Sequence, residues 1–464
     1  MKLFRNISYT LLSNLLSILV SALIVLIVPK FIGVNSYGMW QIFYFYAGYV
    51  GVLHLGWADG LFLRRGGQYI EKIDSKEIKS ETILFLLFNL IIGSTIFAVG
   101  IFVQPEYRFI ICALGFTVVI VNFRTWITMI LQSTEQFKKF AINLSTQSLI
   151  YIILVLLFLL FGVRKYEFMI MAFLISQIFT SISGLVQIHQ FILEPGWDFP
   201  QAVIESKKNI NAGSKLMVAN FTAMLIIGVV RFGIQQKWSV ATFGKVSLIL
   251  TIANLLMVFI NAVSLVLFPS LRRTTQNTLR LYNGIRDVLM PLLFLMMIFY
   301  FPMKIIIPIW LPKYAGVVKY FSVLVPMMIY QGKFEILSNT FMKNLRMEKS
   351  LLLVNLSTLL LSISITYYTI WIKHNLTHTI ISIAVVMAFR SVLSEFILRN
   401  HLDIPFGSEI FIETIIVFGF MWLTWNCSLR ISLGVYIVSM LGYLVIRRHS
   451  IADGFLYIKD LSKY

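Results

Sequence analysis

The sequence VVRFGIQQKWSVATFGKVSL at residues 229–248 decides the fold, because it ends a membrane-length apolar run and then repeats an earlier pattern. Its part VATFGKVSL (240–248) matches VNSYGMWQI (34–42) near the N-terminus. In both copies an aromatic-glycine pair, Tyr37-Gly38 or Phe243-Gly244, ends a turn and opens the next apolar segment. The repeat predicts a chain built from two half-molecules.

A second internal match supports this prediction. The connection LQSTEQFKKFAINLST (131–146) resembles KNLRMEKSLLLVNLST (343–358), and both close on Asn-Leu-Ser-Thr. Both matches recur at a spacing of roughly 210 residues, as a duplicated bundle would. Transporters are often built from such repeats, with the binding site between them.

Composition identifies a polytopic membrane protein. Of the 464 residues, 58% are hydrophobic and 13% charged, against roughly 25% charged in a soluble domain. Cys112 and Cys427 both lie in apolar segments, so no disulfide framework or Cys/His metal site is expected. The net charge of +19 comes mostly from short loops, which indicates topology rather than a nucleic-acid partner.

A bilayer is spanned by about 20 apolar residues, and the chain offers about fourteen such segments. They lie near residues 8–28, 39–63, 82–103, 109–131, 140–161, 167–193, 212–236, 243–268, 288–308, 317–341, 350–372, 377–398, 409–425 and 429–446. The first is expected to be a retained helix, because no small-residue cleavage site follows it. Lys and Arg concentrate on the side of the N-terminus, so both termini should be cytoplasmic.

The charges of the first half divide into loop and membrane positions. Asp59 lies about one helical turn from Arg64 and Arg65, which cytoplasmic anchoring explains as well as a functional role does. Residues 66–81 mix signs and resemble a solvated loop. Arg124 heads a polar stripe, and an arginine inside a membrane helix costs at least about 2.5 kcal/mol. It should therefore face a protein interior or a wet cavity, unless it snorkels to the cytoplasmic side.

The second half carries more charge inside its segments. Asn220 and Arg231 are the polar members of the seventh segment, and Lys245 opens the eighth as an interfacial lysine or a functional one. Lys333 and Glu335 sit at i, i+2 and so point to different sides, and at least one should meet another helix or the lumen.

The twelfth segment carries Arg390 near its centre and Glu395 further along. Arg390 has no easy route to either interface, so snorkelling explains it less well. The last two segments are nearly free of internal charge and read as peripheral.

Several stretches together resemble the multidrug/oligosaccharidyl-lipid/polysaccharide (MOP) exporter superfamily, and within it the Wzx-like O-antigen and polysaccharide repeat-unit flippases. They are VPKFIGVNSYGMWQ (28–41), HLGWADGLFLRR (54–65), VVRFGIQQKWSVATFGKVS (229–247) and WLPKYAGVVKYFSVLVP (310–326). The family usually has an acidic residue directly before the arginine that is here Arg231, whereas this chain has Val230. A coupling carboxylate would then have to be Asp59, Glu335 or Glu395.

The resemblance implies two six-helix lobes around a central cationic cavity, residues 1–205 and 206–402, followed by a C-terminal helix pair and tail at 403–464. It implies a flippase of the bacterial inner membrane that moves undecaprenyl-diphosphate-linked oligosaccharide to the outer leaflet by alternating access. Membrane lipid and polysaccharide polymerase machinery are the implied partners. Because arginine binds phosphate through a planar fork, Arg124, Arg231, Lys333 and Arg390 are the candidate diphosphate ligands.

Other function classes stay open. A membrane glycosyltransferase, polymerase or ligase would usually need a large external loop or an acidic pair, and residues 30–39 hold no acid. A drug or metabolite exporter would expect a more acidic cavity, and a peptidoglycan-precursor or teichuronic-type flippase would share the present features. No nucleotide-binding glycine loop occurs, so neither a cofactor nor ATP coupling is expected. A channel would need a filter motif, and the sequence shows none.

Overall fold

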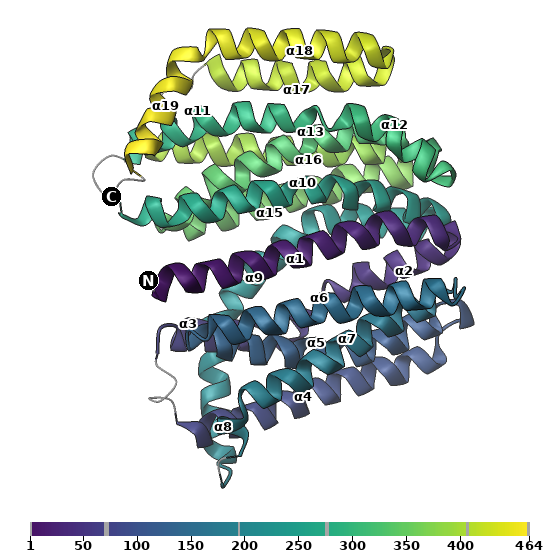
Figure 1. Ribbon diagram of the computed structural model, residues 1–464, viewed down its shortest axis with the longest axis vertical. Coiled ribbons are helices and arrows are strands. Elements are labelled where there is room, and N and C mark those ends of the chain that lie inside the picture. The colour runs from purple at the N-terminus through teal and green to yellow at the C-terminus, as the bar shows by residue number, and fades with distance from the viewer. Residues whose placement is uncertain (1, 69–73, 194, 274–277, 405–407, 462–464) are drawn as a thin grey trace. The chain divides into compact units, whose positions relative to one another are not determined.

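The computed structural model describes residues 2–68, 74–193, 195–273, 278–404 and 408–461. Across these ranges the ordered secondary structure is helical, with no strand (Figure 1). Eleven helical segments within the described residues are long and apolar enough to cross a membrane. The chain is therefore an all-α polytopic membrane protein, as its composition predicted.

The chain divides into two compact units. Unit 1 comprises Met1–Phe221 with Val240–Gly244, and unit 2 comprises Thr222–Ser239 with Lys245–Tyr464. Helix α9 (Phe199–Lys237) begins in unit 1 and ends in unit 2. The division into lobes at 205/206 with a separate C-terminal pair stays a prediction.

Unit 1 is a helical bundle whose members α4, α5, α6 and α7 run side by side (Figure 1). Its elements are α1 (Lys2–Phe31), α2 (Val34–Ala47), the 3₁₀ helix η1 (Val50–His54), α3 (Trp57–Arg65), α4 (Ser75–Phe102), α5 (Pro105–Ser133), α6 (Phe137–Leu160), α7 (Tyr166–Gln187), α8 (His189–Ile192) and the first part of α9.

Unit 2 packs α13 against both α16 and α17, and α11 against the C-terminal helix α19. Its elements are the last part of α9, the part of α10 (Val240–Arg273) that follows Gly244, α11 (Thr278–Met297), α12 (Tyr300–Trp310), η3 (Pro312–Tyr320), α13 (Phe321–Lys333), the π-helical turn η4 (Phe334–Asn339), α14 (Thr340–Asn344), α15 (Glu348–Tyr367), η5 (Tyr368–Ile372), α16 (Leu376–His401), α17 (Ser408–Asn426), α18 (Leu429–Ile446) and α19 (Arg448–Leu461).

Three of the expected segments are helical but are not among the eleven uninterrupted apolar spans. The segment 39–63 is divided into α2, η1 and α3, because Leu55 and Gly56 adopt the left-handed conformation between them. The segment 317–341 is divided by the turn η4. The third is α10 (Val240–Arg273), whose apolar stretch is described over Val240–Leu255. Hydropathy located these segments correctly but could not show the breaks inside two of them.

One sequence interpretation is wrong. The sequence predicts a solvated loop at 66–81, yet α4 begins at Ser75, where the Asp74 side chain accepts hydrogen bonds from the backbone N–H groups of Lys76 and Glu77. Residues 69–73 of that range lie outside the described residues. Such an N-cap satisfies amide groups that the first turn of a helix leaves unpaired. Glu81 is consequently the seventh residue of a helix, and it is fully buried.

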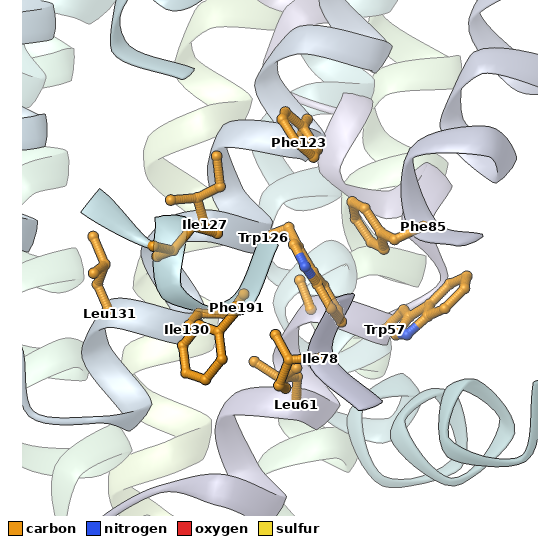
Figure 2. Close-up of a cluster of buried hydrophobic side chains, with 12 residues drawn as sticks. Trp57, Leu61, Ile78, Phe85, Phe123, Trp126, Ile127, Ile130, Leu131 and Phe191 are labelled. Atoms are coloured by element: carbon orange, nitrogen blue, oxygen red, sulfur yellow. The ribbon is translucent and has the colours of Figure 1, made fainter. Parts of the chain in front are cut away.

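The core of unit 1 is a cluster in which indole and phenyl rings meet aliphatic side chains (Figure 2). Phe85 stacks on Trp126 at 4.6 Å between ring centroids, and Trp57 meets both rings edge-on. Ile78 joins from the first turn of α4 and Phe191 from α8. These contacts tie α3, α4, α5 and α8 into one rigid end of the unit.

The two copies of the aromatic-glycine repeat touch each other inside unit 1. A Cβ atom at Gly244 would lie 2.7 Å from the Cα atom of Gly38, so only glycine permits this approach of α10 to α2. The ring of Phe243 meets that of Phe45, with centroids 6.0 Å apart. The repeat therefore marks a packing contact as well as a duplication.

Candidate functional site

Arg124 is held by neutral groups on two neighbouring helices of unit 1. From α5, its Nε donates to Asn143 Oδ1 on α6 at 3.1 Å, and its Nη1 donates to Gln177 Oε1 on α7 at 3.2 Å. Asn143 is fixed in turn, because its Nδ2 donates to the carbonyl oxygen of Thr180 at 2.8 Å. The side chain thus turns toward α6 and α7 within the bundle.

Arg390 has a corresponding arrangement in unit 2. From α16, its Nε and Nη2 both donate to Asn355 Oδ1 on α15, at 3.1 and 2.7 Å. Its guanidinium carbon lies 3.8 Å from the centroid of the Phe334 ring, a cation–π contact. Only 4% of Arg390 is exposed.

The same motif holds both arginines. Asn143 opens the first Asn-Leu-Ser-Thr sequence and Asn355 opens the second. Each asparagine is buried in its unit, and each presents its Oδ1 to the Nε of an arginine on an adjacent helix. The sequence repeat therefore corresponds to a repeated side-chain arrangement that holds a cation in each unit.

Neither guanidinium forms an ion pair with a carboxylate of the described residues. Glu335 acts electrostatically on Arg390, but its Oε2 accepts from Asn339 instead. A buried charge is normally paired, because taking it out of water is costly. Amide oxygens orient these arginines without neutralising their charge.

Lys333 differs from both arginines. Its Nζ lies 2.5 Å from Glu395 Oε2 on α16 and 2.7 Å from Glu413 Oε2 on α17. Arg286 meets Glu413 at 2.5 Å, and Arg399 meets Glu395 at 3.0 Å. As expected from its spacing to Glu335, Lys333 meets other helices, but its charge is balanced within this buried network.

The expectation that the last two segments are nearly free of internal charge and peripheral is wrong at the start of α17. Glu413 is 4% exposed and joins α17 to α11 and α13 through its ion pairs. Glu409 is half-buried and lies within 3.6 Å of both Arg286 and Arg399. Two carboxylates at the edge of an apolar segment thus attach α17 to the rest of unit 2.

The other candidate residues of the C-terminal half are less enclosed. Arg231, half-buried on α9, donates from Nη2 to Ser247 Oγ at 3.2 Å, and Val230 beside it is buried. Lys245 is half-buried on α10, and Asn220 is exposed on α9.

Of the three candidates on α3, the two arginines each pair with a carboxylate on another helix. Arg64 binds Glu205 at 2.8 Å and Asn209 Oδ1 at 2.6 Å, both on α9. Arg65 pairs with Glu77 on α4. Asp59 is half-buried and, among the described residues, pairs with neither arginine. The two arginines therefore join helices of unit 1, which exceeds simple anchoring at the membrane surface.

Sequence reasoning missed the residues that hold the arginines. Gln177 carried no signal of its own, since a single glutamine in an apolar helix has many explanations. Asn143 and Asn355 did carry one, because the repeated Asn-Leu-Ser-Thr places them at matching positions. Glu81 was missed because the start of α4 was placed too late.

Comparison with known proteins shows the fold. No family model and no curated protein sequence matches the chain. Among solved structures, lipid II flippase MurJ in an inward closed conformation is similar with a TM-score of 0.64 and 15% identity, over 97% of this chain and 100% of that one. An inward-facing multidrug resistance MATE family transporter gives 0.54 and 12%, over 84% and 98%. The chain has the fold of MOP-superfamily transporters.

Proposed function

We propose that this chain is a flippase for undecaprenyl-diphosphate-linked oligosaccharides, the repeat units of O-antigen or another surface polysaccharide. It acts as a secondary transporter in the bacterial inner membrane and carries its substrate from the cytoplasmic to the outer leaflet by alternating access. The observation that carries this proposal is a pair of arginines, half-buried Arg124 and buried Arg390, each held by amide oxygens and left without a carboxylate partner among the described residues.

The chemistry of the substrate fits these arginines. A diphosphate carries negative charge that hydrocarbon does not solvate, so it needs a compensating cation during its passage. Arginine supplies two parallel donors and keeps its charge at every physiological pH. In both residues Nε is occupied by an asparagine, while nitrogen donors of the guanidinium remain for phosphate oxygens.

The proposal assigns different roles to the charged candidates. Arg124 and Arg390 bind the diphosphate, and Arg231 assists them. Lys333 is left out of the binding role, because Glu395 and Glu413 already balance its charge. Asp59 and Glu335 lie outside that network and remain the carboxylates proposed for ion coupling.

The surroundings of the protein follow from its topology. The excess of Lys and Arg on the N-terminal side supports cytoplasmic termini. Membrane lipid surrounds the apolar helices, and polymerase machinery that joins the delivered repeat units is the proposed protein partner. Nothing in the proposed transport requires a cofactor.

A flippase for peptidoglycan precursors is the second candidate. It is favoured by the fold likeness to lipid II flippase MurJ, which extends over that whole chain. An exporter of cationic drugs is disfavoured, because unpaired arginines would repel a cation. A polymerase or glycosyltransferase is disfavoured by the likeness to transporters over most of the chain.

The test is the fate of lipid-linked oligosaccharide in cells that lack this protein. Labelled lipid is extracted and the exposure of its sugar on each leaflet is measured, with the same cells carrying the wild-type chain as control. The proposal expects intact repeat units to accumulate facing the cytoplasm. Accumulation of peptidoglycan precursor there instead would identify the second candidate, and unpolymerised units on the outer leaflet would indicate an enzyme.

A further inference from the structure

Glu81 occupies an unusual position for an acidic residue. It follows Ile78 by three positions and precedes Phe85 by four, so the three side chains share one face of α4. That face points into the aromatic cluster of unit 1, where Ile78, Phe85 and Trp57 meet (Figure 2). Glu81 itself has no exposed surface.

The hydrogen bonds of its carboxyl group are asymmetric. Oε1 accepts from Trp57 Nε1 at 2.6 Å and from Asn209 Nδ2 at 2.5 Å. Oε2 is buried and has no hydrogen-bond partner among the described residues. A carboxylate has two equivalent oxygens that both need donors, whereas a protonated acid has one strong acceptor, its carbonyl oxygen. The arrangement favours the protonated acid with the proton on Oε2, because an unpartnered neutral O–H group costs less to bury than an unpartnered carboxylate oxygen.

The charged groups around Glu81 are occupied with one another. Arg65 of α3 pairs with Glu77 of α4, and Arg64 of α3 pairs with Glu205 of α9. The adjoining elements also carry Lys208 of α9, which pairs with Glu205, Asp59 of α3 and the buried His54 of η1, whose ring faces Phe85. Further lysines are Lys76 and Lys79 of α4 and Lys207 and Lys215 of α9. Arg65 acts electrostatically on Glu81, but among the described residues no cation forms an ion pair with it, so its ionised form would be a buried carboxylate without a paired cation.

Asn209 connects this acid to the helix that joins the units. It lies in the first part of α9, and α9 continues into unit 2 beyond Phe221. Here α9 crosses α3 very closely: a Cβ atom at Gly60 would collide with the backbone of Asn209, and one at Gly56 would lie 2.6 Å from the backbone of Gly213. Glu81 thus holds α9 where the two backbones meet.

We propose that Glu81 is a proton-binding site that fastens the first part of α9 to α3 and α4. With the proton bound, the acid accepts from Trp57 and Asn209 and the crossing is closed. When the Oε2–H bond breaks and water takes the proton, the buried carboxylate draws in water and the crossing loosens. The first part of α9 is therefore held firmly against α3 and α4 at low pH and less firmly at high pH. This holds whatever substrate the protein carries.

The test uses the full-length protein in lipid nanodiscs and infrared difference spectra between acidic and alkaline pH. A protonated carboxyl group absorbs apart from a carboxylate, so its loss is seen directly. Wild type should lose a protonated-carboxyl band as pH rises, and Glu81→Gln should lack that band throughout. Glu77→Gln makes the same change one helical turn earlier and should retain the band, but at alkaline pH it should lose the band sooner than wild type, because the change leaves Arg65 without its carboxylate partner.

Amide hydrogen exchange of residues 199–221 tests whether Glu81 holds the first part of α9 against α3 and α4. After correction for intrinsic exchange, these amides should exchange faster at alkaline pH in wild type and in Glu77→Gln. Exchange in Glu81→Gln should be independent of pH, because glutamine imitates the protonated acid. If Glu81→Gln does not fold, Trp57→Phe keeps the acid but removes one donor, and it should shift the carboxyl band. A band that is unchanged in the variant tested, or equal pH dependence of exchange in Glu81→Gln and wild type, would overturn the proposal.

Discussion

Gln177→Glu should abolish substrate recognition by Arg124 while preserving the fold. The Gln177 side chain is buried, and its Oε1 accepts from Arg124 Nη1 at 3.2 Å. Glutamate has the same shape and offers the same acceptor, so the hydrogen bond remains. The change adds only a negative charge, which balances the guanidinium and removes its attraction for an anionic substrate.

The geometry sets the size of the effect. At 3.2 Å the new charge attracts the guanidinium by about 5 kcal/mol at an effective dielectric constant of about 20. Desolvation of the carboxylate offsets much of this, so the thermal stability should stay close to that of wild type. The substrate loses a charge-assisted hydrogen bond worth about 1.5–3 kcal/mol. Its affinity should therefore fall by about tenfold to more than a hundredfold.

The assay is binding of lipid-linked oligosaccharide to purified protein in nanodiscs, followed by the leaflet measurement in cells. Gln187→Glu is the matched control, because it places the same charge on the same helix without contacting Arg124. Gln177→Leu removes the acceptor without adding charge and should bind more weakly than wild type by a smaller factor. Full binding and transport by Gln177→Glu, or an equal loss in Gln187→Glu, would refute a role for the Arg124 charge.

Three further substitutions address separate parts of the structure. Arg390→Lys keeps the charge but not the planar fork, so transport should fall about tenfold if two donors meet the diphosphate; full activity would show that charge alone suffices. Glu413→Gln leaves Lys333 with one carboxylate and should lower the free energy of unfolding by about 3 kcal/mol in a denaturation assay. Substrate preference in a competition assay should not change. Gly60→Ala inserts a methyl group against the Asn209 backbone and should lower the free energy of unfolding by about 1–3 kcal/mol. An unchanged melting temperature would contradict the close crossing of α3 and α9.

Hydropathy predicted the fold because the bilayer imposes it. Apolar segments of membrane length must be helical, since every backbone group has to be satisfied inside its own segment. The breaks in this pattern escaped prediction for a local reason. At Gly56 and Gly60 the chain adapts to a helix that lies far away in the sequence, and nothing near these glycines records that neighbour.

The candidate site was predicted in its residue types but not in its charge balance. The sequence showed that Lys333 and Arg390 both lie inside apolar segments. It could not show that Lys333 meets Glu413, which lies 80 residues further along the chain. Within the part of the chain that the structure describes, Lys333 forms ion pairs and Arg390 forms none, and only the arrangement of helices in space decides between them.

The repeated asparagine resolves why some membrane arginines are retained without a carboxylate. A carboxylate at position 143 or 355 would stabilise the arginine beside it and would also compete with any anion that the arginine serves to bind. An amide oxygen fixes the orientation of the guanidinium through Nε and leaves the net charge in place. The same choice in both units is difficult to explain as packing alone, because apolar residues would fill the space at lower cost. The proposed function accounts for this choice, because a diphosphate ligand requires an arginine that is held in one orientation and keeps its charge.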